Sequence, residues 1–308
     1  MSILTTKELT KQYANHLALN KVSISVSENK IFGLLGPNGA GKTSLIRIIN
    51  QITAPDSGEV TLFDKPISRK DIGLIGYLPE ERGLYKKMKV AEHILYLAQL
   101  KGVSKADAIK RVQYWFKKFE IEAWHAKTID ELSKGMQQKV QFVGTIIHQP
   151  KLLILDEPFS GFDPINALML KEEILNLKST GTTIILSTHN MASVEEICDD
   201  IALINKGVVL LSGSVKEVRE SYKNNLLKIE IQGSTELKES LEKLFPDASI
   251  ENAPNSVLAF STQLANGESP NTIISKLLPL GTIVSINEQL PTMNDIFINS
   301  VNQHNHTK

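Results

Sequence analysis

Residues 36–44 have the types and spacing of a phosphate-binding loop. Gly36 and Gly41 are separated by four residues and are followed directly by Lys42 and Thr43. Glycines let backbone N–H groups point at phosphate oxygens, and the positive end of a following helix adds to the attraction. We expect Lys42 to hold the β- and γ-phosphates and the Thr43 hydroxyl to bind Mg²⁺; the alternative is a glycine-rich turn with a chance Lys-Thr pair. The predicted phosphate-binding residues are Gly36, Pro37, Asn38, Gly39, Ala40, Gly41, Lys42, Thr43 and Ser44.

Two carboxylates and a histidine end two other apolar runs. The run at 151–155 leads directly into Asp156 and Glu157. Acidic groups at the end of a buried strand are costly unless an ion or a substrate uses them, so a metal ion and a water are the expected occupants. A second run, 183–187, leads to His189, which places an imidazole at the same sheet edge. His189 could be a structural hydrogen-bonding group, but the phosphate loop favours a catalytic role.

The segments around these residues predict the elements that position them. Residues 31–35 are an apolar run before the loop and 44–49 follow at helical spacing, so the loop joins a buried strand to a helix. Residues 22–26 alternate with period two, which predicts a small antiparallel sheet ahead of the loop. Tyr13 could stack on an adenine ring from there, or could simply pack.

Further along, the pattern changes from strand to helix and back. Residues 72–78 read as a buried strand, and 90–119 read as a helical insertion whose aromatic residues form its core. Ser133 can cap a helix that begins near Gly135. Residues 201–211 predict a β-hairpin.

The C-terminal part predicts a separate small α+β domain over 221–308. A charged and polar stretch at 219–225 is interpreted as a linker. Beyond it we expect strand 226–231, helix 236–245, a strand pair near 250 and 257–260, helix 272–278, strand 283–286 and helix 292–301. This part holds no constellation that indicates catalysis. The tail residues His304 and His306 could bind a metal weakly, or could belong to a disordered end.

Composition narrows the function classes. The chain has 308 residues, 42% of them hydrophobic, with 34 basic and 34 acidic side chains. Zero net charge argues against nucleic-acid binding by phosphate neutralisation, although a local basic patch stays possible. The single cysteine, Cys198, fits a reducing compartment. Without a long apolar run or a signal pattern, the chain is expected to be cytoplasmic and to reach a membrane only through a partner.

With these motifs in order, the first 220 residues closely resemble the ATP-binding subunit of an ABC transporter. The matching positions are Tyr13 for adenine stacking, the loop at 36–44, the Walker B segment at 152–156, Glu157 as catalytic carboxylate, the 160–164 loop that meets the opposing subunit, and His189 as switch histidine. The C-terminal segment resembles the accessory domain of ABC-2 type export ATPases, including those of sodium-exporting systems.

Two positions depart from the family pattern. The family signature is Leu-Ser-Gly-Gly-Gln. This chain retains its serine and second glycine as Ser133 and Gly135, but Lys134 and Met136 replace the first glycine and the glutamine. Glu80 stands where the family has a glutamine. A carboxylate there could still bind Mg²⁺ or water, but it adds negative charge near the triphosphate unless a metal or a basic neighbour such as Arg82 offsets it.

The resemblance implies an α/β fold: a P-loop NTPase (RecA-like) core with an antiparallel β subdomain and a helical subdomain at about 80–150, within a domain spanning 1–220. It also implies ATP and Mg²⁺ as cofactors and transport driven by ATP-dependent dimerisation. The implied partners are a polytopic permease, which the helical subdomain meets, and a second ATP-binding subunit. We favour export as the direction. A soluble ABC-type ATPase of translation or repair, and a regulatory ATP-binding module with little turnover, are the alternatives.

The resemblance also assigns roles to single residues. Glu157 would polarise the attacking water, while Lys42 and His189 would stabilise charge on the γ-phosphate. Asp156 would hold Mg²⁺ through a water, together with Thr43 and Glu80. Ser133, Gly135 and Asp163 would contact the nucleotide of the facing subunit.

Overall fold

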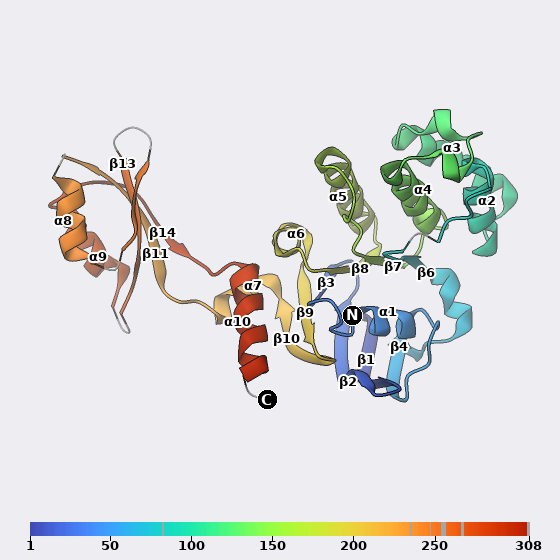
Figure 1. Cartoon of the computed structure of the whole chain (residues 1–308), viewed down its shortest axis with the longest axis horizontal. Coiled ribbons are helices and arrows are strands. Elements are labelled where there is room, and N and C mark those ends of the chain that lie inside the picture. The colour runs from blue at the N-terminus through green and yellow to red at the C-terminus, as the bar shows by residue number, and fades with distance from the viewer. Residues whose placement is uncertain (82, 235, 247, 254–256, 266–267, 307–308) are drawn as a thin grey trace. The chain divides into compact units, whose positions relative to one another are not determined.

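The computed structural model describes residues 1–81, 83–234, 236–246, 248–253, 257–265 and 268–306. The chain forms two compact units (Figure 1). The first comprises Met1–Val215 together with the chain from Phe297 onward, and the second comprises Lys216–Ile296. Arg82, which the sequence suggested as a neighbour of Glu80, lies outside the described residues.

The core of the larger unit is a six-stranded sheet in the order β10-β9-β3-β8-β7-β6. Every residue of β3, β7 and β8 is buried, because these apolar runs have protein on both sheet faces. All neighbouring strands are parallel except β10, which pairs antiparallel with β9. The strands are β3 (Ile31–Leu35), β6 (Ile75–Leu78), β7 (Leu152–Asp156), β8 (Thr183–Thr188), β9 (Asp200–Asn205) and β10 (Val208–Ser214).

The antiparallel sheet predicted ahead of the phosphate loop is present, and it packs against the first sheet. Its order is β2-β1-β4-β5, formed by β1 (Ser2–Tyr13), β2 (His16–Ser27), β4 (Ser57–Leu62) and β5 (Lys65–Pro66). Leu4 and Leu19 of this sheet share one buried cluster with Phe32 and Leu34 of β3 and Ile46 of helix α1. One face of the strand ahead of the phosphate loop is therefore packed against the second sheet and α1.

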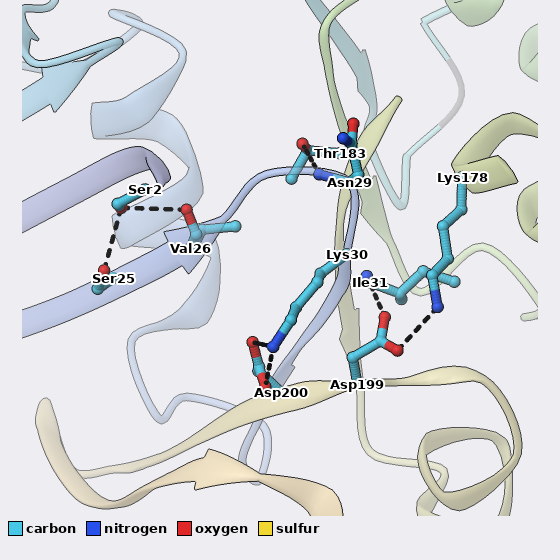
Figure 2. A network of polar contacts seen from close by, with 10 residues as sticks. All are labelled: Ser2, Ser25, Val26, Asn29, Lys30, Ile31, Lys178, Thr183, Asp199 and Asp200. Carbon is cyan, nitrogen blue, oxygen red and sulfur yellow. Dashed lines mark hydrogen bonds and ion pairs between the residues drawn. The ribbon is translucent and has the colours of Figure 1, made fainter. Parts of the chain in front are cut away.

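Polar contacts fix the start of β3 (Figure 2). The Lys30 ammonium is 2.8 Å from the Asp200 carboxylate. Asp199 accepts a hydrogen bond from the Ile31 N–H at 2.8 Å and another from Lys178 at 2.7 Å. These contacts join β3 to β9 and to the helix before β8, so the loop that follows β3 begins from a fixed position.

Helices complete the larger unit. Helix α1 follows the phosphate loop, and α2, α3 and α4 group together as the helical subdomain (Figure 1). In this subdomain Trp115 packs against Phe119, and Phe119 against Phe142, with ring centroids 5.8 Å apart and ring planes tilted in each pair. This confirms that the aromatic residues of the helical insertion belong to its core. The helices are α1 (Lys42–Ile49), α2 (Val90–Leu100), α3 (Lys105–Lys118), α4 (Lys134–Ile146), α5 (Pro164–Ser179) and α6 (Met191–Ile197), with short 3₁₀ helices η1 (Arg69–Leu74), η2 (Glu122–Trp124) and η3 (Ile129–Glu131). No helix among the described residues combines the length and apolar composition needed to cross a bilayer.

Two sequence predictions about local structure were wrong in part. The strand predicted over 72–78 begins only at Ile75, because η1 occupies the preceding residues. Ser68 and Asp71 close a capping box at its start, with the Ser68 N–H 2.8 Å from the Asp71 carboxylate, and this favours a helical turn. The predicted linker at 219–225 is also partly helical, since α7 spans Val215–Ser221.

The smaller unit has the strand order of a split β-α-β fold. Its antiparallel sheet runs β12-β13-β11-β14, and Leu227, Ile229 and Ile231 of the central strand β11 face the buried cluster formed with α8 and α9. The elements are β11 (Leu226–Gly233), α8 (Leu237–Leu244), β12 (Ile250–Ala253), β13 (Val257–Gln263), α9 (Pro270–Leu277) and β14 (Gly281–Gln289), followed by α10 (Met293–His306). The α+β prediction for the C-terminal part is confirmed.

Ile229→Ala is expected to lower the free energy of unfolding of the smaller unit by about 3 kcal/mol, because it leaves a cavity at a fully buried position. Calorimetry of the full chain measures this loss, and ATP affinity should not change. Lys228→Ala, one residue earlier on the exposed face of β11, is the control. An equal loss in both variants would contradict the assigned core.

Candidate nucleotide-binding site

One cavity of about 270 Å³ collects most of the predicted phosphate-binding and acidic residues. It lies where the β1–β2 hairpin, the loop after β3, the start of α1 and the ends of β6 and β7 meet. Its lining residues are Tyr13, His16, Ala18, Asn38, Gly39, Ala40, Gly41, Lys42, Thr43, Ser44, Glu80, Asp156 and Glu157. Gly36 and Pro37 lie just outside this lining, at the beginning of the loop.

The loop requires glycine at its two motif positions. Gly41 has φ 111°, and a Cβ there would lie 2.4 Å from the Ala18 carbonyl oxygen. A Cβ on Gly36 would lie 2.2 Å from the Ile204 carbonyl oxygen. Gly41 is also the N-cap residue of α1 and has no side chain to cap it, so the first N–H groups of the helix face the cavity without a side-chain acceptor. This is the geometry that an anion needs.

Lys42 is buried and already makes two hydrogen bonds to the loop. Its ammonium donates to the carbonyl oxygen of Gly36 at 2.6 Å and to that of Pro37 at 3.1 Å. Burial lowers the pKa of Lys42, and the charges of Glu157, Asp156 and Glu80 oppose this shift. The lysine therefore holds the loop closed until a phosphate competes with the carbonyl oxygens.

The two carboxylates occupy different environments at the end of β7. Asp156 is 3% exposed, and burial is the main cause that raises its pKa. Glu157 has a left-handed backbone with φ 48°, which turns its side chain toward β8. Its carboxylate accepts a hydrogen bond from the Thr188 hydroxyl at 3.3 Å and lies 2.7 Å from the His189 Nδ1. The predicted meeting of Glu157 and His189 at one sheet edge is present.

The donor set of the cavity fits Mg²⁺. The Thr43 hydroxyl and the carboxylates of Asp156 and Glu80 are hard oxygen ligands in one cavity. Among the described residues, no three His, Cys, Asp or Glu side chains are grouped closely enough to hold a metal alone. An ion here would therefore need water and phosphate oxygens as further ligands, which is how Mg²⁺ usually binds with nucleotides. The His306 side chain, part of the suggested tail metal site, lies outside the described residues.

Besides Gly36 and Pro37, three predicted nucleotide contacts and the predicted catalytic His189 do not line this cavity. Ser133 and Gly135 lie at the start of α4, where the Ser133 hydroxyl accepts a hydrogen bond from the Met136 N–H at 3.3 Å. Asp163 caps α5 and accepts from the N–H groups of Ile165 and Asn166. Gly135 and Asp163 are absent from the lining together with Ser133.

Three residues near the cavity were missed in the sequence. His16 and Ala18 line it, and His16 pairs with Tyr13 across the hairpin, so the strand pattern after Tyr13 could have suggested it. Gln141 is buried and donates to the Pro79 carbonyl oxygen at 3.3 Å, which supports the segment carrying Glu80. No local pattern singles out this glutamine, because its partner is 62 residues away in the sequence.

The parallel sheet, the glycine loop leading into α1, and the carboxylate pair at the end of β7 define a P-loop nucleoside triphosphatase. The comparisons with known proteins specify the family. The description "ABC transporter" matches residues 19–160, and "ATP-binding protein DrrA1-3-like, C-terminal domain" matches residues 213–301. The ABC transporter ATP-binding protein YhaQ of Bacillus subtilis is 38% identical over 299 residues, covering 97% of this chain and 98% of YhaQ.

Two further comparisons agree. The lantibiotic transport ATP-binding protein SrtF of Streptococcus pyogenes is 32% identical, covering 73% of this chain and 98% of SrtF. The solved structure of an ATP binding subunit of an ABC transporter has a TM-score of 0.68 at 30% identity, covering 72% of this chain and 93% of that one. The chain belongs to the ABC transporter ATP-binding proteins. It is an ATP-hydrolysing subunit of a membrane transporter, and these relatives do not support the soluble ATPase or the regulatory module.

Proposed function

We propose that this chain pairs with a second ATP-binding subunit, identical or closely related, and drives a polytopic permease from the cytoplasmic face of the membrane. The observation that carries the proposal is the cavity that brings together the glycine loop, Lys42 and the Asp156–Glu157 pair. The loop N–H groups and Lys42 bind the phosphates, and Tyr13 stacks on the adenine at the edge of the cavity.

Glu157 acts as the general base for hydrolysis. An attacking water gives its proton to the Glu157 carboxylate while its oxygen attacks the γ-phosphorus and ADP departs. The contact with His189 supports this role, because the imidazole lies 2.7 Å from the Glu157 carboxylate and can orient it. Thr43, Asp156 and Glu80 would hold Mg²⁺, which supplies charge neutralisation at the β- and γ-phosphates when bound.

The second subunit completes the site. Ser133 and Gly135 at the start of α4, and Asp163 at the start of α5, are presented to the nucleotide of the facing subunit. The Gln138 amide donates to the Ser160 carbonyl oxygen, which joins α4 to the 160–164 loop. The two segments that reach toward the partner are therefore linked to each other and are expected to move together when ATP closes the dimer.

The helical subdomain at about 80–150 is assigned to the contact with the permease. Export is the favoured direction, because the C-terminal domain resembles that of ABC-2 type export ATPases and a relative is named for lantibiotic transport. We propose a boundary between the nucleotide-binding and accessory domains near residue 220.

Purification of the native complex from detergent-solubilised membranes tests this proposal. Mass spectrometry is expected to identify one stoichiometric polytopic membrane protein with this chain. A chain that carries Lys42→Ala should still be recovered with that protein, since the docking surface is separate from the phosphate loop. Recovery only from the soluble fraction, with ribosomes, nucleic acid or no partner, would contradict the proposed role.

Glu80→Gln is expected to tighten ATP binding without Mg²⁺ by about two- to fivefold, because it removes one negative charge from the cavity that receives the triphosphate. Titration calorimetry in the presence of a chelator measures this change. Glu81→Gln removes the same charge from the following residue, which is exposed and outside the cavity lining, and should change the ATP dissociation constant less. Weaker binding by Glu80→Gln than by the wild-type chain would show that Glu80 does not face the phosphates.

A further inference from the structure

Another cavity, of about 580 Å³, lies at the end of the parallel sheet opposite the phosphate loop. It is found where β7 and β8 begin, between α3 of the helical subdomain and α5 of the core. The Asp156–Glu157 pair lies at the other end of β7, so the proposed hydrolysis uses none of the side chains that line this cavity. A cavity of this size can hold a small organic molecule.

Three cations line this cavity. Lys110 and Arg111 belong to α3, and Lys151 directly precedes β7. Lys110 and Lys151 are exposed, and neither forms an ion pair with a residue that the structure describes. Arg111 donates one hydrogen bond, at 3.0 Å, to the carbonyl oxygen of Ile147 at the end of α4. Because a guanidinium carries five N–H donors, others remain available for a ligand.

Negative charge near the cavity does not offset these cations. Among the described residues of the lining the carboxylate is that of Glu173, which is 5% exposed. It already has the Lys118 ammonium at 2.6 Å and accepts a hydrogen bond from the Asn176 amide at 3.2 Å. The C-terminal ends of α4 and α5 also border the cavity, but each carries only about half an elementary negative charge. The cavity therefore presents a net positive charge, which an anion complements.

Part of the lining is aromatic and apolar. Trp115 is buried and Tyr114 is 56% exposed, and their rings pack edge-on with centroids 5.1 Å apart. Ile146, Pro150 and Leu177 continue this apolar surface. A flat ring placed against Tyr114 would bury apolar area on both partners. The lining therefore fits a molecule that combines an anionic group with a flat apolar ring.

We propose that this cavity binds a small organic anion, a phosphate or carboxylate that carries a flat apolar ring. Lys110, Arg111 and Lys151 bind the anionic group, and the ring packs on the side chain of Tyr114. This ligand is distinct from the ATP that the phosphate loop binds, so the inference goes beyond the proposed function.

The cavity joins two parts of the larger unit. Lys110 and Arg111 come from the helical subdomain, whereas Lys151 is continuous with the central strand β7. The other end of β7 leads into Glu157, the proposed general base. An anion held by both groups of cations therefore restrains the helical subdomain relative to the strand that precedes this carboxylate. Such a ligand would act on the subunit as an effector and not as a substrate.

Tryptophan fluorescence of the full chain tests the site with phenyl phosphate, which combines a flat ring with a dianion. The chain has two tryptophans, and Trp124→Phe leaves Trp115, which lines the cavity, as the single emitter. With ADP saturating the phosphate loop, phenyl phosphate is expected to change the Trp115 emission saturably. Inorganic phosphate lacks the ring and should need about a tenfold higher concentration to compete. No saturable change at millimolar phenyl phosphate would overturn the proposal.

Lysine variants in the same Trp124→Phe chain test the role of the cations. Lys110→Met with Lys151→Met is expected to weaken phenyl phosphate binding by about tenfold or more, because two of the three cations are lost. Both lysines are exposed, so the melting temperature and the ADP dissociation constant should not change. Lys105→Met is the matched control, since this exposed lysine begins the same helix outside the cavity lining. Equal affinity for phenyl phosphate in the double variant and in this control would overturn the proposal.

Discussion

Glu157→Gln is expected to lower the rate of ATP hydrolysis by about 10²- to 10³-fold while leaving ATP binding intact. The amide has the shape of the carboxylate and can still contact the Thr188 hydroxyl and the His189 ring. It cannot accept the proton of the attacking water, so ATP stays bound and the closed dimer accumulates. Steady-state phosphate release measures the rate, and size-exclusion chromatography with ATP measures the dimer.

The matched control is Glu172→Gln, the same change on α5, away from the phosphate cavity. It should hydrolyse ATP at the wild-type rate and remain as monomeric as wild type. If Glu157→Gln hydrolysed ATP as fast as this control, another group would have to activate the water. His189 would then be the next candidate, because it contacts Glu157 directly.

Lys42→Ala is expected to weaken ATP binding by about 10- to 100-fold, because a buried ammonium that would bind the phosphates is removed. The same change also frees the carbonyl oxygens of Gly36 and Pro37, which Lys42 holds in the structure. Part of the loss therefore reflects a loop that is no longer held in shape. Titration calorimetry gives the dissociation constant.

Lys30→Ala is the control for this variant. Lys30 contacts Asp200 at the opposite end of β3 from the phosphate loop (Figure 2). Its loss should cost at most about 1 kcal/mol of stability, as for other partly exposed ion pairs, and should leave the ATP dissociation constant unchanged. An unchanged dissociation constant in Lys42→Ala would count against the phosphate-loop assignment.

Local patterns predicted the parts of the site that are continuous in the sequence. The loop at 36–44 and the run ending at Asp156 needed only glycine spacing and uninterrupted apolar residues, which report buried parallel strands directly. The placement of Glu157 and His189 at one sheet edge followed from the rule that parallel strands end at the same edge, whereas their direct contact did not. The start of the strand at Ile75 was harder to predict from the sequence, because the Ser68–Asp71 capping box favours a helical turn where the apolar residues favour a strand.

Features that depend on tertiary contacts could not be read from the sequence. Gln141 supports the Glu80 segment through a hydrogen bond to Pro79, which lies 62 residues away in the sequence. No periodic pattern predicts such a contact. His93 on α2 is another example. The sequence shows a histidine on an apolar helix, and such a histidine usually finds a hydrogen-bond partner in the core. Only the packing around α2 shows that this one has none within the described part of the chain.

The order of the compact units changes how deletions of the accessory part must be designed. The smaller unit occupies Lys216–Ile296, and the chain from Phe297 onward returns to the larger one, so this part is an insert with two tethers. Ending the chain near residue 220 would remove the returning segment together with the insert, and a defect in ATP hydrolysis could belong to either. Excising the insert internally and closing the gap with a short flexible linker keeps the returning segment. A defect in ATP hydrolysis that appears in this deletion then results from loss of the insert.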